Sequence, residues 1–152
     1  MSLLAAEARA QNSASITATA NVLTPLTVVG AQNLSFGNVF PGLNKTVAVT
    51  DAGAGRFDVA GQANANVSLS FVLPSNLSDG SGNLLPIGSW TGEHNTTGTA
   101  TGANFTPSAG ATNTTLSGTG NLYVFIGGQV TPAVNQPAGL YSGSVQMTVV
   151  YF

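Results

Sequence analysis

The chain has 152 residues, of which 43% are hydrophobic and only 5% are charged, and its formal net charge is −2. A chain of this length and apolar content can bury a hydrophobic core, so we expect one folded domain. After residue 10 the basic residues are Lys45 and Arg56, which are too few to neutralise a row of phosphates and argue against nucleic acid as a partner. The absence of cysteine is compatible with a reducing compartment and with a secreted protein that needs no disulfide.

Residues 1–10 are interpreted as the remnant of a signal peptide. Ala8, Arg9 and Ala10 form the small-x-small pattern that precedes signal-peptidase cleavage, and an apolar run lies before them. This pattern predicts Gln11 as the first mature residue. The run is short for a complete leader and has no basic start, so a disordered tail or a cloning scar is the alternative.

Period-two alternation of apolar and polar residues recurs along the rest of the chain. It predicts an antiparallel all-β fold, either a sandwich or a barrel. The expected strands cover residues 14–22, 26–29, 46–50, 56–60, 66–73, 122–126 and 143–152. The segment 122–126 is apolar on both faces, which is typical of a central strand.

Residues 88–120 are rich in Thr, Gly, Asn and Ser, with Trp90, Phe105 and Leu116 as their large apolar residues. We expect a long, exposed and irregular excursion, or alternatively short edge strands anchored by Trp90 and Phe105. Long loops in compact domains are often functional. This segment is therefore a candidate site for a glycan or another surface ligand.

Residues that could carry chemistry are sparse. The single histidine, His94, lies beside Glu93, and no Gly-x-Ser-x-Gly nucleophile motif occurs. Residues 79–83 resemble the start of an EF-hand loop, but Trp90 stands at the twelfth position, where a bidentate Glu is needed. A glycine-rich turn is the better interpretation. We therefore expect no enzyme, cofactor, metal or small-molecule substrate.

Two uncharged alternating segments lie towards the ends of the mature chain. The first places five small or branched residues on one face: Ala14, Ile16, Ala18, Ala20 and Val22. The second places four larger ones on one face: Val145, Met147, Val149 and Tyr151. Unprotected strand edges pair with other chains, and strand addition supplies both backbone hydrogen bonds and pockets for alternate side chains. We expect residues 11–23 to be an extension that donates its strand to the next subunit, and residues 24–152 to be the domain that receives one.

The same residues resemble a family. Gly139 is fourteenth from the C-terminus, Tyr151 is penultimate, and the alternate apolar positions lie between them, as in the C-terminal strand of chaperone-usher pilins. Residues 23–42, which include the run Leu34-Ser35-Phe36-Gly37-Asn38-Val39, resemble the opening strands of spore coat protein U and its relatives. Residues 138–143, which include Tyr141, resemble an element of pilin-like secreted bacterial domains of unassigned function.

This resemblance implies an incomplete immunoglobulin-like β-sandwich that is secreted to the periplasm and polymerises by donor-strand exchange. The implied acceptor-groove residues are Gly139, Tyr141, Val145, Met147, Val149 and Tyr151. The chain departs from the pattern at Leu26, because such pilins often carry the first cysteine of a disulfide near that position.

The leading functional hypothesis is a pilin, the structural subunit of an extracellular bacterial filament. Its partners would be identical subunits in a homopolymer, with a periplasmic chaperone and an outer-membrane usher. The first alternative is a self-contained secreted β-sandwich that binds glycan or surface ligands through residues 88–120. The second is a monomeric surface-layer or matrix component.

Overall fold

The structure, a computed structural model describing residues 11–152, contains ten strands and no helix in that range. The signal-peptide interpretation of residues 1–10 lies outside the described residues. The strands are β1 (Thr27–Gln32), β2 (Lys45–Val47), β3 (Gly55–Ala60), β4 (Asn66–Val72), β5 (Asn76–Ser78), β6 (Leu84–Asn95), β7 (Ala103–Phe105), β8 (Thr112–Thr115), β9 (Asn121–Val130) and β10 (Gln146–Tyr151). The part of the chain that the structure describes holds no helix with the length and hydropathy needed to cross a membrane.

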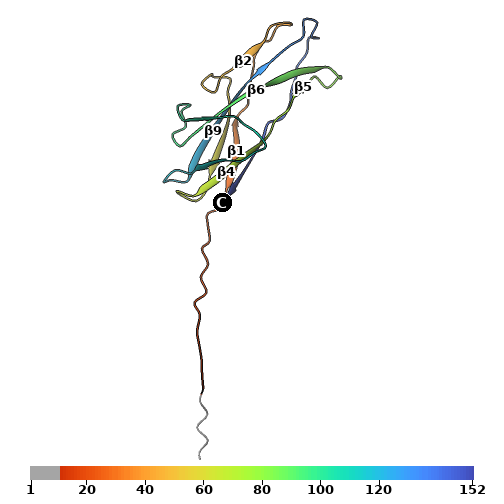
Figure 1. Ribbon diagram of the computed structural model, residues 1–152. Coiled ribbons are helices and arrows are strands. Elements are labelled where there is room, and N and C mark those ends of the chain that lie inside the picture. Colours follow the sequence, from red (N-terminus) through yellow and green to blue (C-terminus); the bar gives the residue numbers. More distant parts are fainter. Residues whose placement is uncertain (1–10) are drawn as a thin grey trace, which may run out of the picture.

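The strands form two antiparallel sheets, which confirms the predicted immunoglobulin-like β-sandwich. The first sheet has the order β1-β3-β9-β6-β5, with β2 paired to β9 and β7 paired to β6. The second sheet has the order β10-β4-β8. The domain is elongated, and the segment preceding β1 projects from one end, beside the C-terminus (Figure 1).

Strand alternation explains how the sheets bury their inner faces. In β4 the inward residues Val67, Leu69 and Phe71 are buried, and the residues between them are partly exposed. Strand β9 is buried along most of its length and lies between β3 and β6. The prediction of a central strand at residues 122–126 is therefore confirmed.

The core consists of two clusters. The larger one joins the two sheets through Val59, Val67, Leu69, Phe71, Leu116, Leu122, Val124, Ile126 and Met147. The smaller one has three buried residues, Leu85, Ile87 and Val130, with partly buried neighbours that include Phe36, Val39 and Tyr141. Trp90 packs against both clusters. The thinner end of the core therefore lies where β6 and β9 meet the loops that follow β1 and β9.

The strand predicted at 46–50 ends earlier than expected, at Val47. The backbone N–H of Ala48 donates to the carboxylate of Asp51 at 2.8 Å, and the N–H of Asp51 donates to the carbonyl of Ala48 at 3.0 Å. These contacts close a turn that competes with the strand, as Asp side chains commonly do.

The prediction of an irregular excursion at residues 88–120 is wrong, and its alternative of short strands is the better description. Strand β6 continues to Asn95, and β7 and β8 follow it. Phe105 packs against the larger core cluster, and Leu116 is buried in it. Small polar residues thus form strands here because a few apolar anchors hold them against the sandwich.

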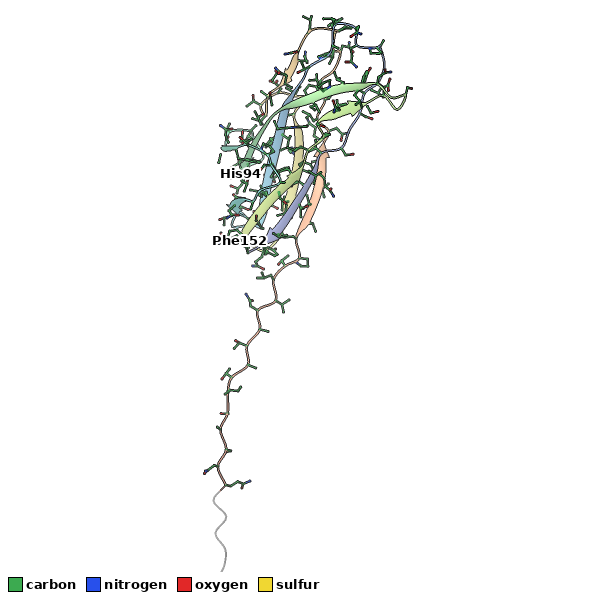
Figure 2. The ribbon with its side chains drawn as sticks, turned by 45° about the vertical axis from the view of Figure 1, so that its right-hand side comes forward. His94 and Phe152 are labelled. Carbon is green, nitrogen blue, oxygen red and sulfur yellow. The ribbon has the colours of Figure 1, made fainter. Side chains whose placement is uncertain are left out.

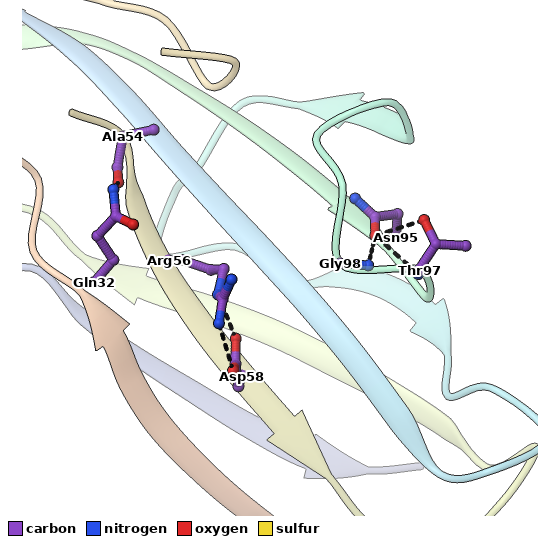
Figure 3. A network of polar contacts seen from close by, with 7 residues as sticks. All are labelled: Gln32, Ala54, Arg56, Asp58, Asn95, Thr97 and Gly98. Carbon is purple, nitrogen blue, oxygen red and sulfur yellow. Dashed lines mark hydrogen bonds and ion pairs between the residues drawn. The ribbon is translucent and has the colours of Figure 1, made fainter. Parts of the chain in front are cut away.

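Two polar contacts lie on β1 and β3 of the first sheet (Figure 3). The side-chain amide of Gln32 donates to the carbonyls of Ala52 and Ala54, at 2.7 and 2.9 Å. Arg56 and Asp58 form a two-point ion pair on β3, with N···O distances of 2.8 and 3.0 Å. The far end of β1 is therefore held to the segment that leads into β3.

Candidate functional site

The candidate site is a groove of about 1220 Å³ between β1, with the loop that follows it, and residues 136–145, which lead into β10. Within the described residues β1 pairs with β3 alone and β10 pairs with β4 alone, so each has a free backbone edge. A smaller hollow of about 560 Å³ continues along β10 as far as Met147, and it shares Gly30, Phe57 and Val145 with the groove. The two form one channel along the opening of the sandwich.

Both core clusters contribute to the floor of this channel. Its apolar lining includes Leu34, Phe36, Val39, Phe57, Leu77, Leu85, Ile87, Trp90, Ile126, Val130, Tyr141 and Val145. The volume exceeds the roughly 300–1,000 Å³ typical of a small-molecule pocket. An elongated apolar channel between two strand edges has the shape and chemistry to accept a further β-strand.

Strand β1 is the clearest sign that a strand can be added. All six of its residues are exposed, although β1 belongs to the first sheet. Val28 lines the smaller hollow and is still 39% exposed. A Cβ atom placed on Gly30 would meet no atom within 4 Å. The inner side of β1 thus faces open space where a closed sandwich would have packed side chains.

The predicted donor residues lie outside the sandwich. Residues 11–23 form no strand in the single chain, and the segment runs away from the domain (Figure 2). Ile16 is 96% exposed and Val22 is 91% exposed. Ala14, Ala18 and Ala20 are exposed as well. The extension therefore carries an apolar face that has no partner among the described residues.

The predicted acceptor residues fall into two groups. Gly139, Tyr141 and Val145 line the groove, and Met147 lines the smaller hollow. Val149 and Tyr151 instead pack against the larger core cluster. The alternation along the C-terminal strand is as predicted. Its last two inward residues, Val149 and Tyr151, pack in the core beyond the end of the channel.

The extension is anchored at its root by Tyr151. The Tyr151 hydroxyl donates to the carbonyl oxygen of Thr24 at 2.6 Å and accepts from the N–H of Gln62 at 2.7 Å. The side-chain carbonyl of Gln62 also accepts from the backbone N–H of Thr24 at 3.2 Å. We call these three residues the clasp. The clasp joins the start of the domain to the end of β10 and closes that end of the channel.

Sequence reasoning missed the residues that the groove draws from other elements. The sequence pattern assigns no site role to Gly30 or to Phe57, which lies in the strand predicted at 56–60. Phe36 and Val39 belong to residues 34–39, which carried the family resemblance without an assigned role. A glycine in an alternating strand was the available signal, because glycine often marks a close approach by another backbone.

The polar segment 88–120 is organised around Glu93, a buried carboxylate on β6. Its Oε1 accepts from the N–H of Gly102 at 2.7 Å and from the side-chain amide of Asn95 at 2.8 Å. The side-chain carbonyl oxygen of Asn95 in turn accepts from the backbone N–H groups of Thr97 and Gly98, at 3.0 and 2.8 Å (Figure 3). Glu93 therefore holds together the turn between β6 and β7.

His94 is half-buried on the other side of the same strand. Its Nδ1 lies 3.2 Å from the hydroxyl of Thr114 on β8 and so links the first sheet to the second. Burial lowers the pKa of His94 below its ordinary value, and the neighbouring Glu93 opposes this shift. His94 lies at a junction between sheets, away from the groove-lining residues.

The EF-hand-like segment is a turn. The Asp79 carboxylate accepts from the backbone N–H groups of Ser81 and Asn83, at 2.8 and 3.1 Å, and from the Asn83 side-chain amide at 2.6 Å. The Asn83 side chain is the main reason that the pKa of Asp79 is lowered. Within residues 11–152 no three metal-ligating side chains gather at one place.

Comparison with known families gives one match. The profile of a family described as "Domain of unknown function (DUF4402)" matches residues 26–151. The chain belongs to this family. The DUF4402 match begins one residue before β1 and ends with β10, so it includes both strands that border the groove and leaves out the extension. No curated protein matches the chain.

Proposed function

We propose that this DUF4402 protein is a structural subunit of an extracellular homopolymer. Residues 14–22 of one subunit fill the groove between β1 and β10 of the next. The observation that supports this most is that one chain carries two complementary features. One is an apolar channel bordered by free strand edges, and the other is an exposed extension with apolar residues at every second position.

The two surfaces are complementary in kind. A strand inserted between β1 and β10 offers its backbone N–H and C=O groups to both free edges. Its alternate side chains, which include Ile16 and Val22, leave water and pack against the apolar lining of the channel. Insertion also covers Val28, which the channel leaves exposed in the single chain. The gain therefore comes from completing the acceptor as well as from burying the donor.

The proposed contact is heterologous, because the tail of one subunit meets the groove of another. Such contacts do not close on themselves and generate an open filament. The interacting segments carry no charge between residues 11 and 44 or between residues 94 and 152. The joint should therefore be insensitive to ionic strength, since screening acts on charged groups.

The proposal includes secretion, with residues 1–10 as the end of a leader and the cell surface as the destination. An open apolar channel must be kept from premature association. A periplasmic chaperone that lends a strand, followed by an outer-membrane usher, would meet this need.

The glycan-binding alternative loses its main support. Trp90 packs against both core clusters, and Phe105 packs against the larger one. The rings of Trp90 and Phe105, both within residues 88–120, therefore pack towards the interior. Sugar-binding surfaces typically present exposed aromatic faces.

Electron microscopy of negatively stained full-length protein tests the proposal. We expect thin uniform filaments that survive detergent and dissociate only when heated. The matched preparation is a chain that lacks residues 11–22, which should yield no filaments. Monodisperse single domains from the full-length chain, or normal filaments from the shortened one, would overturn the proposal.

A further inference from the structure

The end of the channel opposite the clasp carries a cluster of exposed apolar side chains, which we call the rim. The rim consists of Phe40, Leu43, Val134 and Leu140. Val134 and Leu140 are 87% and 88% exposed, the highest values among the large apolar side chains of residues 24–152. Phe40 and Leu140 also line the groove, so the rim is the mouth of the channel.

The rim is held in place by ordered loops. The N–H of Gly42 donates to the carbonyl of Ala133 at 3.0 Å, which joins the loop before β2 to the loop after β9. The Tyr141 hydroxyl donates to the carbonyl of Pro137 at 2.9 Å and lies 2.9 Å from the side-chain amide of Gln136. These contacts fix the backbone while the apolar tips remain outside. The rim is therefore an exposed apolar surface on an ordered backbone.

The direction of strand entry follows from the two ends of the channel. The clasp closes one end, and β1 runs away from it while β10 runs towards it. The extension leaves its own domain at the clasp end, which lies far from β2 (Figure 1). A donor that enters through the open mouth has its N-terminus nearest the acceptor's clasp, so it runs antiparallel to β10. Its root then lies at the acceptor's rim.

Chain length supports this placement. Residues 14–22 span eight steps, about 26 Å when extended, and residues 141–151 span ten steps, about 33 Å. A donor strand with Val22 at the mouth therefore reaches most of the way to the acceptor's clasp. After Val22 only Leu23 remains before Thr24, which the donor's own clasp holds. One residue leaves no room for a flexible linker between the two domains.

We infer that the rim is a second subunit contact, which receives Leu23, Pro25 and the clasp end of the neighbouring copy. This inference rests on the proposed strand donation and adds a direct contact between the sandwiches. Both surfaces are uncharged, because residues 11–44 and 131–152 contain no ionisable side chain except Tyr141 and Tyr151. The contact buries apolar side chains and desolvates no charge. It sets the angle between successive subunits.

Cross-linking of the full-length chain locates the contact. The chain has no cysteine, so Leu23→Cys together with Leu140→Cys introduces the only two thiols. In filaments treated with a short bis-maleimide we expect a ladder of covalent oligomers. The control pair, Leu23→Cys with Val150→Cys, places the second thiol on β10, away from the mouth, and should give no ladder. Filaments of the first pair that yield no ladder would overturn the inference.

A rim variant separates the inference from the proposal on which it rests. The substitutions Leu43→Ser and Val134→Ser alter two exposed rim side chains that do not line the groove, so the fold and the strand-binding channel should be unaffected. We expect filaments that still resist detergent but dissociate about tenfold faster on warming, equivalent to about 1.4 kcal/mol. The control is Val72→Ser with Val150→Ser, two exposed residues of the second sheet. Equal dissociation rates in filaments of wild type and rim variant would overturn the rim contact alone, whereas a wild type without filaments would overturn both.

Discussion

The hydroxyl of Tyr151 donates to the carbonyl oxygen of Thr24 at 2.6 Å, across 127 positions of the sequence. The same hydroxyl accepts from the N–H of Gln62 at 2.7 Å. A Cβ atom on Gly61 would overlap the Tyr151 hydroxyl, so glycine is needed for this close approach. The last strand of the domain thereby fixes the point at which the extension leaves it.

Replacing this hydroxyl tests the clasp. Tyr151→Phe keeps the ring in the core and leaves the N–H of Gln62 without its partner. We expect the free energy of unfolding to fall by about 1–2 kcal/mol, the usual cost of an unpaired polar group. Urea denaturation measures the change. The control is Tyr123→Phe, which removes a hydroxyl from a different strand, β9. An unchanged unfolding midpoint in Tyr151→Phe would show that the clasp contributes nothing.

Filling the channel from β1 tests the acceptor. Gly30→Leu places a side chain in open space, so we expect a stably folded monomer that forms no filaments. Gly88→Leu is the matched control, because a Cβ there also meets no atom within 4 Å and Gly88 does not line the groove. Electron microscopy and thermal unfolding measure the two effects separately. Normal filaments from Gly30→Leu would place strand addition elsewhere.

Alternation in the extension predicts a difference between adjacent residues. Ile16→Asp puts a charge on the face that enters the groove, which costs several kcal/mol when it is buried without a partner. We expect filament formation to be lost. Thr17→Asp lies on the other face and should reduce assembly only slightly. Both residues are exposed in the single chain, so neither change should affect unfolding, and equal assembly of the two variants would be inconsistent with an alternating donor.

His94 predicts a pH dependence of stability. Burial lowers its pKa below the ordinary value of 6.5, so the unfolded state binds a proton more readily than the folded state. Stability is therefore complete above about pH 6.5 and falls as the pH drops towards the lowered folded pKa. Urea denaturation from about pH 7 to about pH 5 should show a decline in the wild type that is weaker in His94→Gln. Identical slopes in the two proteins would argue against this assignment.

The strands could be predicted where alternation was regular. β4 and β10 were found because large inward residues alternate with mostly polar outward ones, and β9 was found because residues 122–126 form a continuous apolar run. β5 was missed, and β6 was anticipated only by the alternative of a short edge strand anchored by Trp90, because their residues follow no simple alternation and β6 has a register shift between Gly88 and Thr91. Pairing decides their conformation, since β6 pairs with β9, which is distant in sequence, and β5 pairs with β6.

The candidate site was predictable only in part. The extension and the C-terminal strand are local patterns, so the sequence shows both. The groove is a gap between β1 and the segment that leads into β10, and its floor comes from β3, β5, β6, β9 and two loops. Such a gap depends on how distant elements pack. The rim was missed for the same reason, since exposed apolar loop residues are recognisable only after the fold separates them from the core.

Hydrogen exchange across residues 14–22 tests the central claim most directly. In the monomer these backbone amides have no strand partner among the described residues, so exchange should be fast. In the assembled state we expect strong protection of the same amides, together with new protection of β1 and β10. Fast exchange of residues 14–22 in filaments, or equal protection in monomer and filament, would contradict strand donation.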